Sequence, residues 1–186
     1  MIVKQYVTSR LKLRTLDEKD APQVLDYVVR NEQFLFPWEP LRTPDYYTLE
    51  RQRELLRFDQ SSMALEQLLK VWLFKQAEPN RIIGSIALSN IVRGAFQSCH
   101  LGYKLDGEEV NRGYMEEALR TVVSIAFEEL RLHRIEANIM PRNGASLRLV
   151  EKLNFQPEGL ARKYLKINGK WEDHIHMTLI NEALDL

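Results

Sequence analysis

A long amphipathic segment between two extended runs is the feature that most constrains the fold. Apolar residues recur at spacings of three and four over residues 113–130, which is the period of an α-helix with one buried face. They are Met115, Leu119, Val122, Val123, Ala126 and Leu130. Residues 100–105 before this helix and residues 133–140 after it are predicted strands. This strand–helix–strand step favours parallel pairing of the two strands.

The remaining strands predict a mainly antiparallel sheet. Alternating or continuous apolar runs mark them at residues 11–14, 71–74, 82–88, 160–167 and 171–180. Consecutive strands joined by short connections, including a predicted turn at residues 78–80, are typical of a meander. The last two strands are joined by Asn168-Gly169, which is the dipeptide most typical of a tight hairpin turn.

Three further segments connect these strands. Asp17 is a predicted N-cap for a first helix, and Asp45 is a predicted N-cap for a second one. Residues 34–40 between them are rich in aromatic residues and proline, so we predict a loop there. A short helix is predicted over residues 146–153, and Asn154 follows it where a left-handed residue commonly ends a helix.

Length and composition favour one domain that covers residues 1–186. The chain is 45% hydrophobic and 28% charged, and a chain of this length can bury a full core. The sequence has no internal repeat and no low-complexity linker. The predicted class is therefore α+β: a mixed, mainly antiparallel sheet with helices on its faces.

Charge and cysteine content disfavour several classes of partner. The 26 basic and 26 acidic residues cancel, so nothing in the net charge favours nucleic acid or an anionic membrane. No run of 18 apolar residues occurs, and the N-terminus lacks the apolar region of a secretory signal. Cys99 is the single cysteine and cannot form an internal disulfide, so we expect a reduced cytoplasmic location. The sequence is compatible with an oligomer.

The start of the long helix is a candidate anion site. The first N–H groups of a helix have no partner within the helix, and the helix dipole is positive there. Gly113 would let a phosphate approach the backbone closely, and Arg112 adds a positive charge. A glycine at a helix start is also common for structural reasons. The nearby acids, including Glu116 and Glu117, are expected to face solvent and favour the dipole.

Several motifs in a fixed order resemble the acetyl-CoA core of the GNAT N-acetyltransferases. They lie at residues 101–105, 111–119, 133–137, 143–146 and 151–155. More narrowly, the chain resembles the branch that acetylates the N-termini of ribosomal proteins. Residues 9–14, Asp20-Ala21, Pro37-Trp38 and residues 171–173 match that branch. The resemblance covers nearly the whole chain and implies a twisted GNAT sheet with a splayed central parallel pair.

The phosphate loop departs from the family pattern at two positions. The family has Gln or Arg at the position of Val110, and Gly or Ala at the position of Met115. Gly113 keeps the central glycine. Because backbone amides make most of the diphosphate contacts, the resemblance still implies acetyl-CoA as co-substrate. It assigns the diphosphate to a set of residues in this loop: Asn111, Arg112, Gly113, Tyr114, Met115 and Glu116.

The resemblance also implies a path for pantetheine and a set of catalytic residues. Pantetheine would pair with the strand at Tyr103, Lys104 and Leu105 like an added strand. Ser146 matches the family serine near the CoA sulfur, and its hydroxyl would donate to the leaving thiolate. Asn143 would hold pantetheine or the loop. The alternative for Ser146 and Asn143 is that they only cap a helix.

The general base and the acceptor contacts are less constrained by the sequence. Glu136 lies on the strand that would flank the thioester, and a carboxylate there could accept a proton directly or through water. The alternative is a structural acid paired with an arginine. Trp38 and Glu39 are candidates for the acceptor side. No metal is expected, because His174 and His176 have no evident third ligand.

Three functions are compatible with these residues. The first is acetylation of a protein N-terminal α-amine, which the resemblance favours. The second is acetylation of a small-molecule amine such as a polyamine or an antibiotic, and the third is a non-catalytic acyl-CoA-binding module. The α-amine is also the easier acceptor, because we expect a single uncertain carboxylate base and no neighbouring cation that would lower the pKa of a lysine.

Overall fold

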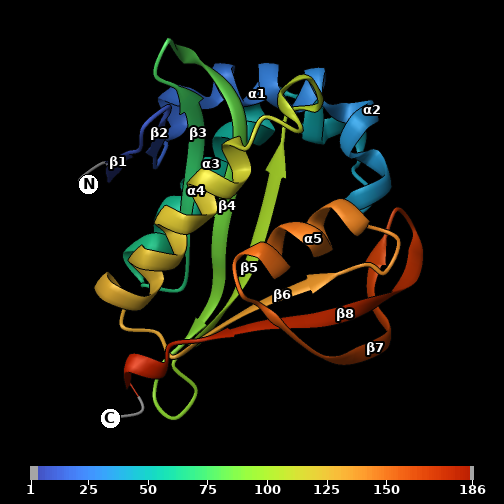
Figure 1. Cartoon of the computed structure of the whole chain (residues 1–186). Helices are drawn as coiled ribbons and strands as arrows, with labels where there is room; N and C mark the ends of the chain where they lie inside the picture. The colour runs from blue at the N-terminus through green and yellow to red at the C-terminus, as the bar shows by residue number, and fades with distance from the viewer. Residues whose placement is uncertain (1–3, 185–186) are drawn as a thin grey trace.

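A computed structural model describes residues 4–184 of the chain. Its strands form one sheet in the order β1-β2-β3-β4-β5-β6-β8-β7 (Figure 1). The strands are β1 (Gln5–Val7), β2 (Leu11–Arg14), β3 (Leu69–Lys75), β4 (Glu78–Val92), β5 (Ser98–Leu105), β6 (Arg134–Ile139), β7 (Gln156–Ile167) and β8 (Lys170–Ile180). Only β5 and β6 are parallel, so the predicted mainly antiparallel sheet with one parallel pair is confirmed.

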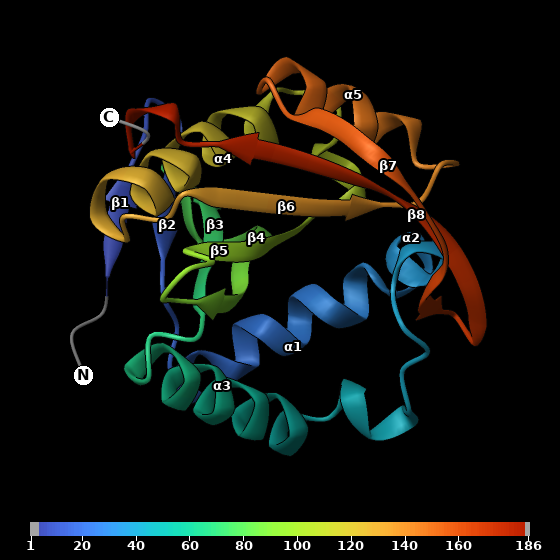
Figure 2. The ribbon, with the colours of Figure 1, turned by 90° about the horizontal axis from the view of Figure 1, so that it is seen from below.

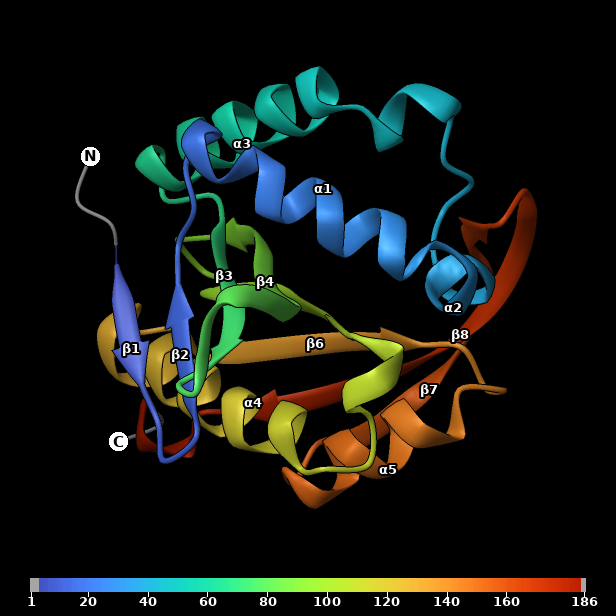
Figure 3. The ribbon, with the colours of Figure 1, turned by 90° about the horizontal axis from the view of Figure 1, so that it is seen from above.

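Helices cover both faces of the sheet. They are α1 (Ala21–Arg30), α2 (Glu32–Leu35), α3 (Leu49–Ala64), α4 (Tyr114–Ser124) and α5 (Gly144–Lys152). In Figures 2 and 3, α1 and α3 lie on one side of the sheet and α4 and α5 on the other. Within residues 4–184, no helix is both long and apolar enough to cross a membrane.

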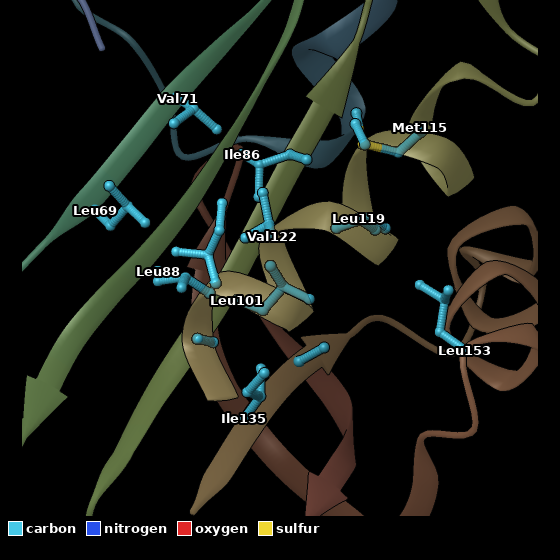
Figure 4. Packing of buried hydrophobic residues seen from close by; sticks show 14 of the residues in the cluster. Leu69, Val71, Ile86, Leu88, Leu101, Met115, Leu119, Val122, Ile135 and Leu153 are labelled. Carbon is cyan, nitrogen blue, oxygen red and sulfur yellow. The ribbon is translucent and has the colours of Figure 1, made fainter. Parts of the chain in front are cut away.

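Two apolar cores hold these layers together. The larger core lies between the sheet and the α4–α5 side, where Ile86 and Leu101 face Leu119 and Val122 of α4 (Figure 4). The smaller core joins α1 and α3 to β3 through residues such as Tyr27, Leu56 and Phe74. Because side chains alternate along a strand, the strands in the middle of the sheet supply apolar residues to both cores.

The parallel pair is short and then opens. Its ladder has three residue pairs, Ser98↔Arg134, Cys99↔Ile135 and His100↔Glu136. Beyond them β5 and β6 leave in different directions (Figure 1). The remaining residues of β5 up to Leu105 therefore have no partner strand on that side, as the predicted splay requires.

Several predicted helix ends and turns are confirmed. Asn154 has a φ of 67°, and the hairpin turn has positive φ at Asn168 and Gly169. The long helix is confirmed as α4, which continues through one π-helical turn over Ile125–Glu129.

Three local predictions are wrong. Residues 78–80 belong to β4 rather than to a turn, because the hairpin closes at residues 76–77 and the pairing is irregular beside Lys75, where Pro79 is tolerated. Residues 32–38 are helical, as α2 and a 3₁₀ turn. Asp45 lies inside another 3₁₀ turn, and Thr48 caps α3 instead by accepting a hydrogen bond from Arg51 N at 3.3 Å.

Candidate active site

A cavity of about 930 Å³ lies where β5 has left β6. Residues 102–105 of β5 line it, whereas the residues of β5 that pair with β6 do not. Tyr103 and Leu105 pack with the core on the α4–α5 side, so Gly102 and Lys104 point to the opposite face. The cavity is therefore open to groups from both faces of the sheet at the splay.

The two faces contribute different elements to the cavity. On the α4–α5 side its lining includes Val110, Asn111, Gly113, Tyr114, Met115, Glu116, Asn143, Ala145, Ser146, Arg148, Leu149 and Lys152. On the other side its lining includes Phe34, Leu35, Trp38, Glu39, Arg42, Lys70, Ser85 and Ala87. We refer to these two parts as the α4 end and the acceptor end.

The α4 end contains the start of a helix with free backbone donors. Gly113 is the N-cap of α4, and its φ of 77° is left-handed. The N–H groups of Tyr114, Met115 and Glu116 belong to the first turn, where no preceding carbonyl of the helix can accept them. An anion in this part of the cavity would meet these donors and the positive end of the helix dipole.

A partly buried group of hydrogen bonds around Glu117 holds this helix start to the N-terminal hairpin, which is formed by β1 and β2. Glu117 accepts hydrogen bonds from Thr8 Oγ1 at 2.5 Å, Ser9 Oγ at 2.9 Å and Arg10 N at 2.8 Å, and it forms an ion pair with Arg10 Nε at 2.7 Å. Although partial burial opposes ionisation, these hydrogen bonds lower the pKa of Glu117 to about 2. Glu117 therefore does not simply face solvent. Arg10 also donates to Arg112 O at 2.9 Å.

Asn143 and Ser146 have separate roles at the start of α5. Asn143 is the N-cap, and its Oδ1 accepts a hydrogen bond from Ser146 N at 3.2 Å. The Tyr103 hydroxyl donates to Ser146 O at 3.3 Å. Burial raises the pKa of Tyr103 to about 12, so this phenol stays protonated at neutral pH. The cap is thus made by Asn143, while Ser146 lines the cavity.

Two of the predicted site residues are not among those that line the cavity. Arg112 pairs with the buried Glu109, at 3.1 Å between Nη1 and Oε2. Glu136 lies in the short parallel ladder, and its Oε1 accepts a hydrogen bond from Arg134 Nε at 2.8 Å. This is the arrangement of the alternative considered above, a strand acid paired with an arginine.

The other predicted residues are brought together in this one cavity. From the loop and from α4 they are Asn111, Gly113, Tyr114, Met115 and Glu116; from β5 they are Tyr103, Lys104 and Leu105; from the remaining segments they are Asn143, Ser146, Trp38 and Glu39.

Of the cations at the acceptor end, Lys104 was predicted as a contact for pantetheine, whereas Arg42 and Lys70 were not predicted as site residues. Lys104 Nζ lies 2.7 Å from Glu39 Oε1, and Arg42 Nε lies 3.4 Å from Glu39 Oε2. Burial alone would raise the pKa of Glu39, but Lys104 and Arg42 outweigh it and the pKa is lowered. Lys70 Nζ pairs with Asp59 Oδ2 at 2.6 Å. The expectation of no neighbouring cation is therefore wrong.

No group of three or more His, Cys, Asp or Glu side chains in residues 4–184 is placed to hold a metal ion. The charged groups that line the cavity are instead those of lysine, arginine and glutamate. Such an arrangement can bind anions and can stabilise charge through hydrogen bonds.

Comparison with known proteins places the chain in a family. The acetyltransferase (GNAT) domain model matches residues 10–156, and the chain belongs to this family of N-acetyltransferases. It is 42% identical over 169 residues to a probable N-acetyltransferase, YjcK, of Bacillus subtilis, covering 91% of this chain and 93% of that one. It is 36% identical over 174 residues to the [ribosomal protein uS5]-alanine N-acetyltransferase of Escherichia coli, covering 92% and 88%.

A solved structure shares the whole architecture. The ribosomal-protein-S5-alanine acetyltransferase of Vibrio fischeri superposes with a TM-score of 0.91 at 34% sequence identity, covering 96% of this chain and 97% of that one. The predicted GNAT fold and the resemblance to the ribosomal-protein branch are both confirmed.

Proposed function

We propose that this enzyme transfers the acetyl group of acetyl-CoA to the N-terminal α-amine of a protein. The observation that carries the proposal is one continuous cavity that joins a helix start and Ser146 on one face of the sheet to a polar acceptor end on the other. A donor and an acceptor that enter from opposite faces would meet at the splay. The similarity to two acetyltransferases named for ribosomal protein S5 supports a protein acceptor.

The α4 end fits the diphosphate and pantetheine of acetyl-CoA. Asn111 and the residues from Gly113 to Glu116 line the cavity at the helix start, and Arg148 and Lys152 of α5 line the same part. The edge of β5 from Tyr103 to Leu105 offers unpaired backbone groups to an extended pantetheine arm. Val110 and Met115 line the cavity but bring no charge to the diphosphate.

The reaction requires a neutral amine and a protonated leaving group. The amine nitrogen attacks the thioester carbon, the carbon–sulfur bond breaks, and one proton passes overall from nitrogen to sulfur. In the proposed mechanism Ser146 Oγ donates its proton to the thiolate and is reprotonated, directly or through water, by the proton that the amine nitrogen releases. A backbone amide near Tyr103 or Lys104 stabilises the oxyanion. Glu136 would act only through water, because it does not line the cavity.

The acceptor end favours a neutral amine by electrostatics. Arg42, Lys70 and Lys104 disfavour an ammonium ion beside them, since like charges lower the pKa of an amine. An α-amine has a pKa near 7.7–8.0, and neutralising it at pH 7 costs about 1 kcal/mol, compared with about 4.6 kcal/mol for a lysine near 10.4. The lower cost of neutralising an α-amine suits a site whose candidate base, Glu136, does not line the cavity.

The same cations weigh against a polycationic small-molecule acceptor. A polyamine would place further ammonium groups against Arg42, Lys70 and Lys104, with Glu39 already paired to two of them. A non-catalytic acyl-CoA module remains the second alternative, and turnover decides it. We place the reaction in the cytoplasm, where the buried thiol of Cys99 would stay reduced.

Two peptides that share one sequence except at a single internal position test the proposal. One has a free N-terminus and no lysine, and the other is N-terminally blocked and carries an internal lysine. With acetyl-CoA, mass spectrometry should locate the acetyl group on the α-amine of the first peptide only. Equal modification of the blocked peptide would make the N-terminal assignment wrong. Acetylation of spermidine but of neither peptide would favour the small-molecule alternative.

A further inference from the structure

The acceptor end of the cavity has a surplus of hydrogen-bond donors. Lys70 from β3, Lys104 from β5 and Arg42 from the segment after α2 all line it. An ammonium has three N–H donors and a guanidinium has five. The contacts described above use one donor of each side chain: Lys70 to Asp59, Lys104 to Glu39 and Arg42 to Glu39. Each of these three acceptor-end cations also lies over an aromatic ring, Lys70 over Trp72, Lys104 over Tyr27 and Arg42 over Tyr46. Their other N–H groups donate no hydrogen bond to a described residue and could donate to a ligand.

The two carboxylates that pair with these cations are fully engaged. Glu39 uses Oε1 for Lys104 and Oε2 for Arg42, and Asp59 Oδ2 accepts from Lys70 at 2.6 Å. The cations outnumber these two partners, and Glu32 is a further carboxylate in an adjoining pocket that Arg42 and Lys104 also line. The three cations line the same cavity, and burial lowers the pKa of Lys70 despite its contact with Asp59.

The sheet surface that lines the cavity beside these cations consists of small residues. Ser85 and Ala87 of β4 and Gly102 of β5 line the acceptor end. A Cβ atom added at Gly102 would meet nothing within 4 Å. The acceptor end therefore has room for main chain and for a short side chain, and the groups around that room can donate hydrogen bonds to oxygen atoms.

We propose that the acceptor-end cations bind a carboxylate of the acceptor close to its reactive amine, so that the preferred substrate is a polypeptide with Asp or Glu directly after its N-terminal residue. The inference rests on the proposed function and names the acceptor class for the same site. The α-carboxylate of a free amino acid has the same chemistry, and the experiment distinguishes the two sources.

The experiment compares acceptors at saturating acetyl-CoA. Three C-terminally amidated peptides differ only at the second residue, which is Glu, Gln or Arg after an N-terminal Ala, and none contains lysine. A charge-assisted hydrogen bond in this partly desolvated place should raise kcat/KM for the Glu peptide about tenfold above the Gln peptide. The Arg peptide should be slower than the Gln peptide. L-Alanine and L-alaninamide form the free amino acid arm, and both should be poor acceptors.

Variants of two lysines on one strand test whether the acceptor-end cations cause the preference. In Lys70→Gln the Glu-to-Gln ratio should fall to nearly one, and Lys70→Arg should restore most of it because the charge returns. Lys75→Gln is the matched control. Lys75 also belongs to β3 and pairs with a buried carboxylate, Glu109, at 2.7 Å, but it does not line the cavity. Its ratio should stay near the parent value.

The outcomes separate this inference from the proposed function. Equal rates on the Glu and Gln peptides, or a ratio that survives Lys70→Gln in a folded protein, would overturn the carboxylate subsite while peptide acetylation stands. Faster acetylation of L-alanine than of any peptide would keep the subsite and overturn the polypeptide assignment. Absence of acetylation on every peptide would refute the proposed function itself.

Discussion

The backbone of Ser146 has a structural role at the start of α5, and its hydroxyl has the proposed chemical role. Its backbone N–H donates to Asn143 Oδ1 and its carbonyl accepts from Tyr103, so the helix start depends on the backbone of Ser146 and not on its hydroxyl. The hydroxyl belongs to a residue that lines the cavity. Removing the hydroxyl should therefore change chemistry without removing the cap.

We predict that Ser146→Ala lowers kcat by about 100-fold and leaves the KM for acetyl-CoA nearly unchanged, because a proton donor to the leaving group acts mainly in the transition state. Steady-state kinetics with a peptide acceptor measures both constants. Asn143→Ala is the contrasting variant, since loss of the cap should lower the free energy of unfolding by about 1 kcal/mol. An unchanged kcat in Ser146→Ala would mean that its hydroxyl has no part in the reaction.

Gly113 combines a left-handed backbone with a place at the α4 end of the cavity. Its φ is 77°, and a Cβ there would come within 3.4 Å of Arg10 Nη2. Gly113→Val should reduce acetyl-CoA affinity by tenfold or more, measured by calorimetry, because the left-handed conformation costs about 1–2 kcal/mol for an L-residue and the branched side chain narrows the approach to the backbone.

Gly94 supplies the control for this substitution. Its φ is 70° and an added Cβ meets nothing within 4 Å, so Gly94→Val imposes the same backbone strain away from the cavity. It should lose stability and keep its acetyl-CoA affinity. If both valine variants bind acetyl-CoA like the parent, the helix start does not hold the diphosphate.

At the scale of single residues, the sequence located the glycine, the serine and the cap but not their partners. Gly113, Ser146 and Asn154 could be placed at helix ends because each belongs to a local pattern of a few residues, whereas the roles of Gly113 and Ser146 toward acetyl-CoA came from the resemblance. Arg10 and Tyr103 contact this region from segments far away in the chain, and no local pattern reports such contacts. The residues predicted for the acetyl-CoA site came from the resemblance and its spacing.

At the scale of elements, two loops that serve opposite faces of the sheet are tied together. Asn31, between α1 and α2, is buried; its Oδ1 accepts from Gly107 N at 3.0 Å and its Nδ2 donates to Tyr27 O at 3.0 Å. Gly107 follows β5 and leads into the loop at residues 110–113. The junction of α1 and α2 is therefore held to the 3₁₀ turn Gly107–Glu109, which precedes the loop before α4.

We predict that Asn31→Ala weakens acetyl-CoA binding several-fold, although Asn31 lies outside the main cavity. The substitution leaves the N–H of Gly107 and the carbonyl of Tyr27 without this partner, which should also cost about 1–3 kcal/mol of stability. Asn181→Ala is the matched control, because Asn181 is also buried and donates to Leu132 O at 3.2 Å. Asn181→Ala should lower stability and leave acetyl-CoA affinity unchanged. Equal acetyl-CoA affinities in the two variants would contradict a link between Asn31 and the acetyl-CoA site.

The contact between the N-terminal hairpin and α4 should be sensitive to acid. The pKa of Glu117 is lowered to about 2 from an ordinary 4.5, so its contribution to stability is fully present above about pH 4.5 and is lost as the pH falls towards 2. Urea unfolding of the parent and of Glu117→Gln at several pH values should show a difference that is largest near pH 7 and shrinks below pH 4.5. A difference that does not depend on pH would contradict this role.

Elements with a long periodic pattern were predictable, and short or irregular ones were not. Helix α4 repeats its apolar face over several turns, whereas β1 has only three residues, Gln5–Val7, and escaped notice. Residues 32–38 carry prolines and aromatic side chains that favour a loop locally. Packing against the smaller core, for instance by Leu35, outweighs that preference and makes them helical.

At the scale of the whole molecule, one cavity at the splay connects the two faces of the sheet, which the proposed function assigns to the donor and to the acceptor. The resemblance predicted the splay, because it belongs to the fold. The charge of the acceptor end was not predictable from local patterns. Arg42, Lys70 and Lys104 come from three separate segments, and only the assembled fold brings them into one cavity. Local patterns do not report such an assembly, so the expectation of no neighbouring cation was wrong.

The single cysteine gives a probe of the whole fold that does not depend on catalysis. Cys99 is fully buried in β5, within the short parallel ladder, and burial raises the pKa of its thiol to about 12. The folded protein should therefore resist iodoacetamide, and labelling should require an opening of the sheet around Cys99. Mass spectrometry can follow the reaction without ambiguity because the sequence has one cysteine.

Acetyl-CoA should slow this labelling if it binds the folded state. At 100 times its dissociation constant, a ligand specific to the folded state reduces the open population about 100-fold, and acetyl-CoA has no free thiol to consume the reagent. Protection should fall by at least about tenfold in Gly113→Val, as its weaker affinity requires, and should stay at the parent level in Gly94→Val. Rapid labelling in the absence of urea would show that a local motion exposes Cys99. If labelling is slow and acetyl-CoA does not change its rate in the parent protein, the cavity does not bind acetyl-CoA.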